Sequence, residues 1–198
     1  MHIAPGVHVN VWRGLHLENP ASLDWAIAIE ILSKRIRGRY LDPINSLIEA
    51  EKHIPPVDRR FGFAVLAIDC LLVETLGAFL DGLEDTEDKS KATFCRFLTT
   101  RKRFSIDFNE ATAKVFYKHF RCGILHQAET GKHSLIWSIG PLVRLIGDSL
   151  IVNRNEFHQR LTEEFSTYLA ELADPTEATL RKNFRKKMNF IARMTVPS

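Results

Sequence analysis

The sequence has few cysteines and no long uncharged apolar segment. Its three cysteines, Cys70, Cys95 and Cys122, are odd in number and widely spaced, so a disulfide framework is not expected. Because each of them stands among apolar residues, we expect free thiols that pack as small hydrophobic side chains in a reducing compartment. No stretch of about 18 residues is apolar without a charge, which argues against a membrane span.

Several functional signatures are also absent. Residues 1–20 lack the apolar stretch of a secretory signal. There is no phosphate-binding glycine loop, no dinucleotide fingerprint and no evident Ser-His-Asp order, so kinase, dehydrogenase and serine-hydrolase activities have little support. We therefore expect a cytoplasmic protein that contacts no membrane and holds no cofactor. The net charge of +3 permits an acidic partner such as RNA without requiring one.

The length and composition fit one globular domain. With 198 residues, 45% of them hydrophobic, the chain can bury a core, and we expect residues 1–198 to form a single domain. Apolar residues at helical spacing predict a helix from Ser22 to about Tyr40. The pattern resumes after Pro43 and runs to about His53, as a kinked continuation or a second short helix.

The middle of the chain predicts the centre of a helical bundle. The segment from Phe61 to Leu80 is apolar on nearly every side, which is typical of a buried helix. Asp69 and Glu74 in its middle would be costly in lipid, which favours a protein core over a membrane span. A helix around Phe94 that ends at residues 101–103 and a long helix from Asn109 to His126 complete a set of four.

The chain changes character after this set. The β-prone runs 135–137 and 150–152, separated by glycine and proline, predict a small two- or three-stranded hairpin over residues 133–153. Two further helices follow, at about 155–173 and 176–193. The expected fold class is therefore mainly α, with a four-helix core in residues 20–130, an appended hairpin and a C-terminal helical extension over residues 155–196.

The two buried carboxylates are the first candidates for function. Asp69 and Glu74 are the only charged residues between Arg60 and Asp81, and a carboxylate inside a bundle is costly unless a cation or several donors meet it. Arg121, near the end of the last core helix, is the cation set deepest among apolar neighbours. We therefore expect Arg121 to contact Glu74 or Asp69.

Arg121 and His126 form an Arg-x4-His pair within the segment FYKHFRCGILHQAET. This pair resembles the Arg-x4-6-His signature of the HEPN (higher eukaryotes and prokaryotes nucleotide-binding) ribonucleases, and the likeness covers roughly residues 20–130. The resemblance implies a HEPN-like four-helix bundle that cuts RNA without a metal. It also implies that Arg121 and His126 act at a dimer interface, supported by an acidic residue from another core helix, here Glu74 or Asp69. By analogy the protein would be a toxin or defence effector with a regulatory protein partner.

The implied chemistry can be stated in terms of these residues. Attack by the RNA 2′-hydroxyl needs a base, an acid for the leaving oxygen and a cation beside the phosphorane. Imidazole can serve as base or acid, which suits His126, and the guanidinium of Arg121 can grip a phosphate through two nitrogens. Residues five apart on an α-helix point about 140° from each other, so one copy would aim this pair poorly at a common atom. We therefore expect a homodimer with a composite cleft.

Other hypotheses remain open beside the nuclease. The family commonly has Asn, Asp or His after the arginine, and this chain has Cys122, which favours a catalytically inactive HEPN-like module that binds nucleotide or RNA. A purely structural helical interaction module is the third hypothesis. In it Arg121 neutralises Glu74, His126 caps its helix, and the carboxylates belong to a buried ion-pair network.

Two further sets of residues have alternative roles. His119, Cys122 and His126 are spaced for zinc along one helical stripe, but no clear fourth ligand follows, so no metal is expected. The candidate nucleic-acid contacts are Arg101, Lys102, Arg103 and Lys118. The basic C-terminal segment 181–187 either packs on its own protein through an amphipathic helix or contacts an RNA backbone.

Overall fold

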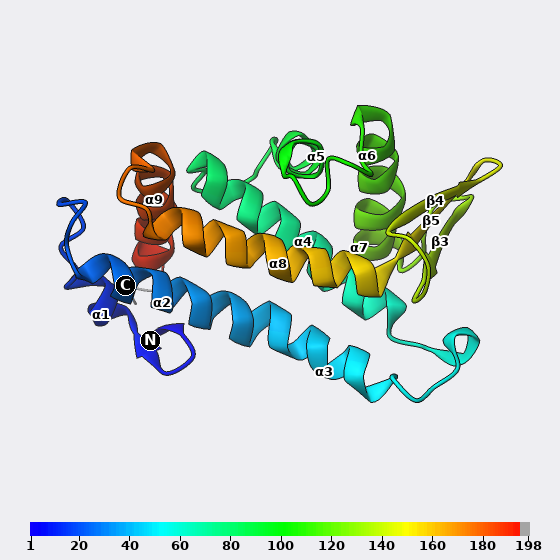
Figure 1. Ribbon diagram of the computed structural model, residues 1–198, viewed down its shortest axis with the longest axis horizontal. Helices are drawn as coiled ribbons and strands as arrows, with labels where there is room; N and C mark the ends of the chain where they lie inside the picture. The colour runs from blue at the N-terminus through cyan, green and yellow to red at the C-terminus, as the bar shows by residue number, and fades with distance from the viewer. Residues whose placement is uncertain (195–198) are drawn as a thin grey trace.

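The computed structural model describes residues 1–194, so residues 195 and 196 of the predicted C-terminal extension lie outside the described part. The described chain is mainly helical, as predicted, with two small sheets (Figure 1). The helices are α1 (Val9–Arg13), α2 (Asp24–Ile36), α3 (Asp42–Ala50), α4 (Gly62–Asp81), α5 (Ser90–Thr100), α6 (Glu110–Phe116), α7 (Gly123–Gln127), α8 (Arg154–Ala173) and α9 (Ala178–Met194). The strands are β1 (His2–Ala4), β2 (Val7–His8), β3 (Ser134–Trp137), β4 (Val143–Ile146) and β5 (Ser149–Asn153).

Helices α2 and α3 follow one another as one long rod along an edge of the molecule (Figure 1). A π-helical turn, Arg37–Leu41, joins them. Pro43 lies in the first turn of α3, where the missing backbone N–H is tolerated. The helical pattern therefore resumes after Pro43 as predicted, without a break in the rod.

Helix α4 is the central helix. Among the described residues it alone is long and apolar enough to cross a membrane, yet 61% of its most apolar window is buried within the chain. It packs against α5, α8 and α9, and Leu66, Val73 and Phe79 are fully buried along it. The predicted buried core helix is confirmed: most of its apolar surface is covered by other helices of the same chain, while Phe63 and Leu71 remain partly exposed.

The long helix expected over Asn109–His126 is present in three parts. Asn109 caps α6 by accepting a hydrogen bond of 2.9 Å from the backbone N–H of Thr112, and its own backbone N–H donates one of 3.0 Å to the Thr112 hydroxyl. The helix is then π-wound over Tyr117–Cys122 before α7 begins at Gly123. This irregular turn contains Arg121, which the sequence pattern could not place.

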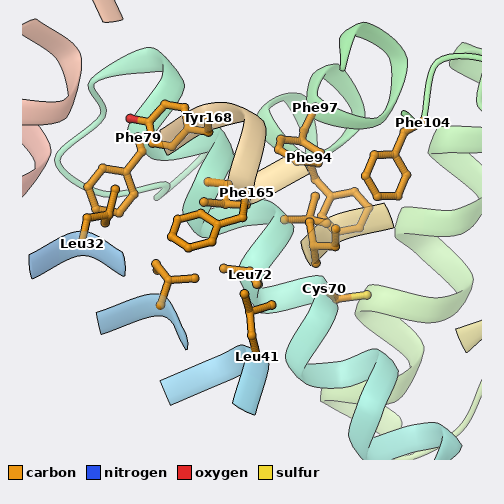
Figure 2. Close-up of a cluster of buried hydrophobic side chains, with 14 of the residues drawn as sticks. Leu32, Leu41, Cys70, Leu72, Phe79, Phe94, Phe97, Phe104, Phe165 and Tyr168 are labelled. Atoms are coloured by element: carbon orange, nitrogen blue, oxygen red, sulfur yellow. The ribbon is translucent and has the colours of Figure 1, made fainter. Parts of the chain in front are cut away.

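The hydrophobic core draws on both the predicted four-helix set and the C-terminal helices. Phe157 of α8 stacks on Phe116 of α6, with ring centroids 5.2 Å apart and the planes 8° from parallel. Figure 2 shows Phe165 and Tyr168 of α8 in one cluster with side chains from α2, α4 and α5. The predicted helices at about 155–173 and 176–193 are confirmed as α8 and α9, and they belong to the same core as α2 and α4.

The predicted hairpin has three strands, in the order β3-β5-β4. Strands β4 and β5 form an antiparallel hairpin with a turn at Gly147, whose φ of 56° suits a residue without a side chain. Strand β3 pairs with β5 in parallel, with Ser134 opposite Leu150. The connection between the parallel strands β3 and β5 contains β4, which pairs with the other edge of β5.

Candidate functional site

Glu74 of α4 is the anchor of the candidate site. Its Oε2 accepts hydrogen bonds from Ser90 Oγ at 2.8 Å and from Arg121 Nη2 and Nε at 2.9 and 3.2 Å. Its Oε1 accepts one from Thr86 Oγ1 at 2.5 Å. The expected contact between Arg121 and Glu74 is therefore confirmed, and both carboxylate oxygens are occupied.

The charge state of this cluster follows from its surroundings. Burial raises the pKa of Glu74, but the hydrogen bonds from Thr86 and Ser90 and the charge of Arg121 outweigh it, so this pKa lies below its ordinary value. Burial likewise lowers the pKa of Arg121, and the Glu74 carboxylate more than offsets that effect. Both groups are thus charged at neutral pH, as a salt bridge in which only 15% of the Arg121 side chain and 11% of the Glu74 side chain are exposed.

His126 lies on the outer side of Arg121. Its Nε2 is 3.3 Å from Arg121 Nη1, the guanidinium nitrogen that Glu74 does not use. A guanidinium can only donate, so a hydrogen bond between these two nitrogens requires His126 Nε2 to accept. The imidazole is exposed, and its basic nitrogen therefore points at a fixed cation at the surface of the protein.

The local winding of the helix brings this pair together. In a π-helix the backbone bonds run from residue i to i+5, so side chains five apart are turned closer to one another than on an α-helix. The π-turn Tyr117–Cys122 leads directly into α7, and the long Arg121 side chain spans the remaining separation. The two side chains thus meet within one copy, although residues five apart on a regular α-helix point about 140° from each other. That one copy aims them poorly at a common substrate atom stays a prediction.

Gly123 holds the end of the helix in place. The loop after α7 packs directly against Gly123. A Cβ at this position would stand 2.5 Å from the carbonyl oxygen of Glu129, so there is no room for a side chain. Ala128 caps α7 in the left-handed conformation, with φ of 53°. The chain thus turns away just after His126 and leaves the imidazole uncovered.

Asp69 is not part of this cluster. It is fully buried on α4 and its Oδ1 lies 2.9 Å from Nδ1 of His158 in α8, while His158 Nε2 lies 3.1 Å from Asn45 Oδ1. Asp69 and Glu74 are five residues apart on an α-helix, which turns them about 140° from each other. Of the two expected partners for Arg121, Asp69 was therefore wrong as a contact, and it belongs to a separate buried group.

The predicted nucleic-acid contacts fall in two places. Arg101 is bonded to Glu164 at 2.5 Å and to Glu171 at 2.9 Å, and Arg103 to Glu163 at 2.5 Å, so both have acidic partners on α8. Lys102 beside them is exposed. Lys118 is exposed within the π-turn that carries Arg121, whereas Arg101 lies eleven residues from Ser90 along α5, about 16 Å from the candidate site.

The alternative sets can also be located. His119 Nδ1 is 3.0 Å from Ser134 Oγ, so it is engaged with β3, and within residues 1–194 no three His, Cys, Asp or Glu side chains converge as metal ligands. Helix α9 packs on its own protein, with Phe184 and Met188 fully buried. Arg181 donates to the carbonyl oxygens of Leu172 and Ala173, which leaves this cation occupied inside the fold.

Three residues of the cluster escaped the sequence analysis. Tyr117 hydroxyl is 3.0 Å from Ser90 Oγ, and its ring lies 5.5 Å from the Arg121 guanidinium carbon. Tyr117 stands four residues before Arg121, a helical spacing that could have pointed to it. Thr86 and Ser90 come from the loop and first turn after α4, and no local pattern marks them as ligands of Glu74.

Comparisons with protein-family models, with curated proteins and with solved structures gave no match to this chain. The argument for a function therefore rests on the geometry of Glu74, Arg121 and His126.

Proposed function

We propose that this protein is a HEPN-like, metal-independent endoribonuclease, with Arg121 and His126 as its catalytic residues and Glu74 as the residue that positions Arg121. The single observation that carries the proposal is the 3.3 Å contact between Nη1 of the Arg121 guanidinium, which Glu74 holds in place, and Nε2 of the exposed His126 imidazole. A cation and a base held side by side are the two groups that attack by a 2′-hydroxyl requires.

The reaction assigns each group a role. When RNA binds, His126 Nε2 exchanges its contact with Arg121 Nη1 for the 2′-hydroxyl and removes that proton, and Arg121 Nη1 donates to a phosphorane oxygen instead. The deprotonated 2′-oxygen attacks the adjacent phosphorus. The bond from phosphorus to the 5′-oxygen breaks, and that oxygen takes a proton from a general acid. The products are a 2′,3′-cyclic phosphate and a 5′-hydroxyl, and Lys118 contributes a nearby positive charge for the RNA backbone.

A homodimer would provide the acid. One His126 acts as base in its neutral form, so the protonated imidazole comes from His126 of the partner subunit in a composite cleft. What supports self-association is an exposed apolar stripe on α4, where Phe63 is 38% and Leu71 41% exposed, with Ala67 between them at the four-residue spacing of one helix face. This stripe lies on the same helix as Glu74.

Cleavage is tested with purified protein and single-stranded RNA in the presence of a chelator. We expect 2′,3′-cyclic phosphate ends from the wild type, at least a hundredfold less product from His126→Ala and Arg121→Ala, and partial activity from Arg121→Lys, which keeps the charge. His53→Ala is the matched control, because His53 is another exposed histidine outside the cluster. Equal cleavage by all variants would mean that the activity is not this protein's.

The alternative is an inactive HEPN-like module that binds RNA, and the half-buried Cys122 beside Arg121 favours it. In that case the wild type binds a 2′-deoxy-substituted, uncleavable strand, Arg121→Ala weakens this binding, and no RNA is cut. Fluorescence anisotropy with the uncleavable strand, measured beside the cleavage assay, separates the two functions.

A further inference from the structure

A second cavity lies at the other end of α4, close to the small sheet. Its volume is about 410 Å³, and it is enclosed by the loop before α4, the end of β3 and the first residue of α8. Figure 1 shows this loop turning beside the end of the molecule where β3 lies. Gly62 at the cavity and Glu74 are twelve residues apart on α4, about 18 Å, so the cavity is separate from the proposed catalytic pair.

The cavity is lined by a buried arginine with an unused donor. The Arg154 side chain is 2% exposed, its Nη2 is paired with Glu51, and its buried Nη1 has no hydrogen-bond partner in the described chain. Buried donors in proteins nearly always have an acceptor. Glu51 cannot supply a second one freely, because its other oxygen already accepts from the backbone N–H groups of Arg60 and Phe61.

A second arginine lines the same cavity. Arg59 donates from Nε to the carbonyl oxygen of Ile54 and from Nη1 to Ser138 Oγ, both at 3.0 Å, and both acceptors are neutral. The cavity lining thus contains two guanidinium groups and no carboxylate, and among the described residues only Arg154 has an ion pair, with Glu51. A guanidinium without an ion pair in a partly enclosed site favours a ligand with one negative charge.

The remaining walls are apolar and flat. Trp137 is 40% exposed, Ile139 51% and Val57 90%, so large hydrophobic side chains gather around the mouth instead of packing in the core. The guanidinium carbon of Arg144 lies 4.7 Å from the centre of the Trp137 ring, outside the cavity lining. This contact holds the indole as a fixed wall.

We propose that this cavity binds a small organic monoanion with a flat apolar body, of the chemical class of the aromatic carboxylates. The carboxylate bonds to Arg154 Nη1 and Arg59, and the ring lies between Trp137 and Ile139. A volume of about 410 Å³ is within the range of small-ligand sites. The inference does not depend on the nuclease proposal, since the two sites share no residue.

The test uses 1-naphthoate as probe and 1-naphthamide as its neutral isostere. Trp12, Trp25 and Trp137 are the three tryptophans of the chain, so two-dimensional ¹⁵N NMR resolves three indole signals. Trp12 and Trp25 are 4% and 5% exposed and serve as internal references. We expect naphthoate to shift the Trp137 signal alone and saturably, and naphthamide to bind at least tenfold more weakly.

Three variants assign the binding to the cavity. Arg59→Gln should weaken naphthoate binding at least tenfold, and Ile139→Glu, which adds a negative charge at an exposed wall, should abolish it. Lys132→Gln removes an exposed cation that neither lines the cavity nor contacts Trp137, and it should change binding less than twofold. Thermal unfolding confirms that each variant is folded. The proposal is wrong if Trp137 shows no saturable shift, if the amide binds as well as the acid, or if Lys132→Gln weakens binding as much as Arg59→Gln does.

Discussion

Arg121 and Glu74 are 47 positions apart in the sequence and are joined by two hydrogen bonds, of 2.9 and 3.2 Å. This pairing uses the inner edge of the guanidinium and leaves Nη1 beside His126. A positioned cation rather than a mobile one is what electrostatic stabilisation of a transition state requires. The role of Glu74 is therefore to orient Arg121.

Loss of the Glu74 charge should affect both stability and cleavage. In Glu74→Gln, Arg121 is left half-buried without its counter-charge, so we expect a loss of about 1–3 kcal/mol in the free energy of unfolding. Misorientation of Arg121 should also lower the rate of RNA cleavage at least about tenfold. Urea denaturation and single-turnover cleavage measure the two effects. Glu110→Gln, which removes an exposed pair with Lys114, is the control and should change neither.

Asp69 should make stability depend on pH. Burial raises its pKa to about 6, although its contact with His158 opposes this shift. The native state therefore holds the Asp69 proton more tightly than the unfolded state, and the associated stability is full below about pH 3.8 and is lost as the pH rises through 6. Between these limits the wild type should lose up to roughly 3 kcal/mol relative to Asp69→Asn. If the difference in the free energy of unfolding between the two proteins stays constant across this pH range, the raised pKa of Asp69 is contradicted.

Self-association should depend on the apolar stripe of α4. Leu71→Asp places a charge at the end of the stripe nearer Glu74, and we expect sedimentation to change from dimer to monomer, with loss of RNA cleavage. Leu145→Asp is the matched control, because Leu145 is 64% exposed on β4, outside the stripe. If Leu71→Asp stays dimeric, the interface lies elsewhere on the protein.

The buried pair of Glu51 and Arg154 should be sensitive to the loss of one partner. Both side chains are 2% exposed, so Arg154→Met leaves a buried carboxylate without its cation and should destabilise the fold by about 3–5 kcal/mol. Arg103→Met, which breaks the exposed pair with Glu163, should cost less than about 1 kcal/mol. Thermal and chemical denaturation measure both losses. If Arg154→Met and Arg103→Met lose similar amounts of stability, burial of the Glu51–Arg154 pair has no special consequence.

Gly123 should not accept a side chain. A Cβ there would meet the Glu129 carbonyl oxygen at 2.5 Å, so Gly123→Ala should displace the loop after α7 and destabilise the fold by about 1–3 kcal/mol. At Gly14 a Cβ would meet nothing closer than 3.5 Å, and Gly14→Ala should be neutral or slightly stabilising. The rate of proteolytic cleavage near residues 128–133 measures how far the loop is displaced, and we expect it to rise in Gly123→Ala. Resistance equal to that of the wild type would contradict the expected displacement.

The position of the helices could be predicted because helical periodicity is a local property of the chain. Phe61–Leu80 was recognised as a buried helix from its composition, and α4 occupies Gly62–Asp81. Glu74 and Arg121 could be matched because a buried charge needs a partner and few cations stand among apolar residues. The need for a cation applies equally to Asp69. The sequence does not show which side of α4 each neighbouring helix packs on, so it could not decide which of the two carboxylates Arg121 meets.

The sequence by itself therefore determined the helical class, the central helix and the pair of candidate catalytic side chains. Tertiary structure decided the rest: the pairing of Asp69 with His158, the parallel place of β3, and the contact between Arg121 and His126 across a π-turn. The physical reason is that periodicity is set by neighbours three or four residues away. The partner of a buried charge and the winding of one irregular turn are set by packing between segments far apart in the chain.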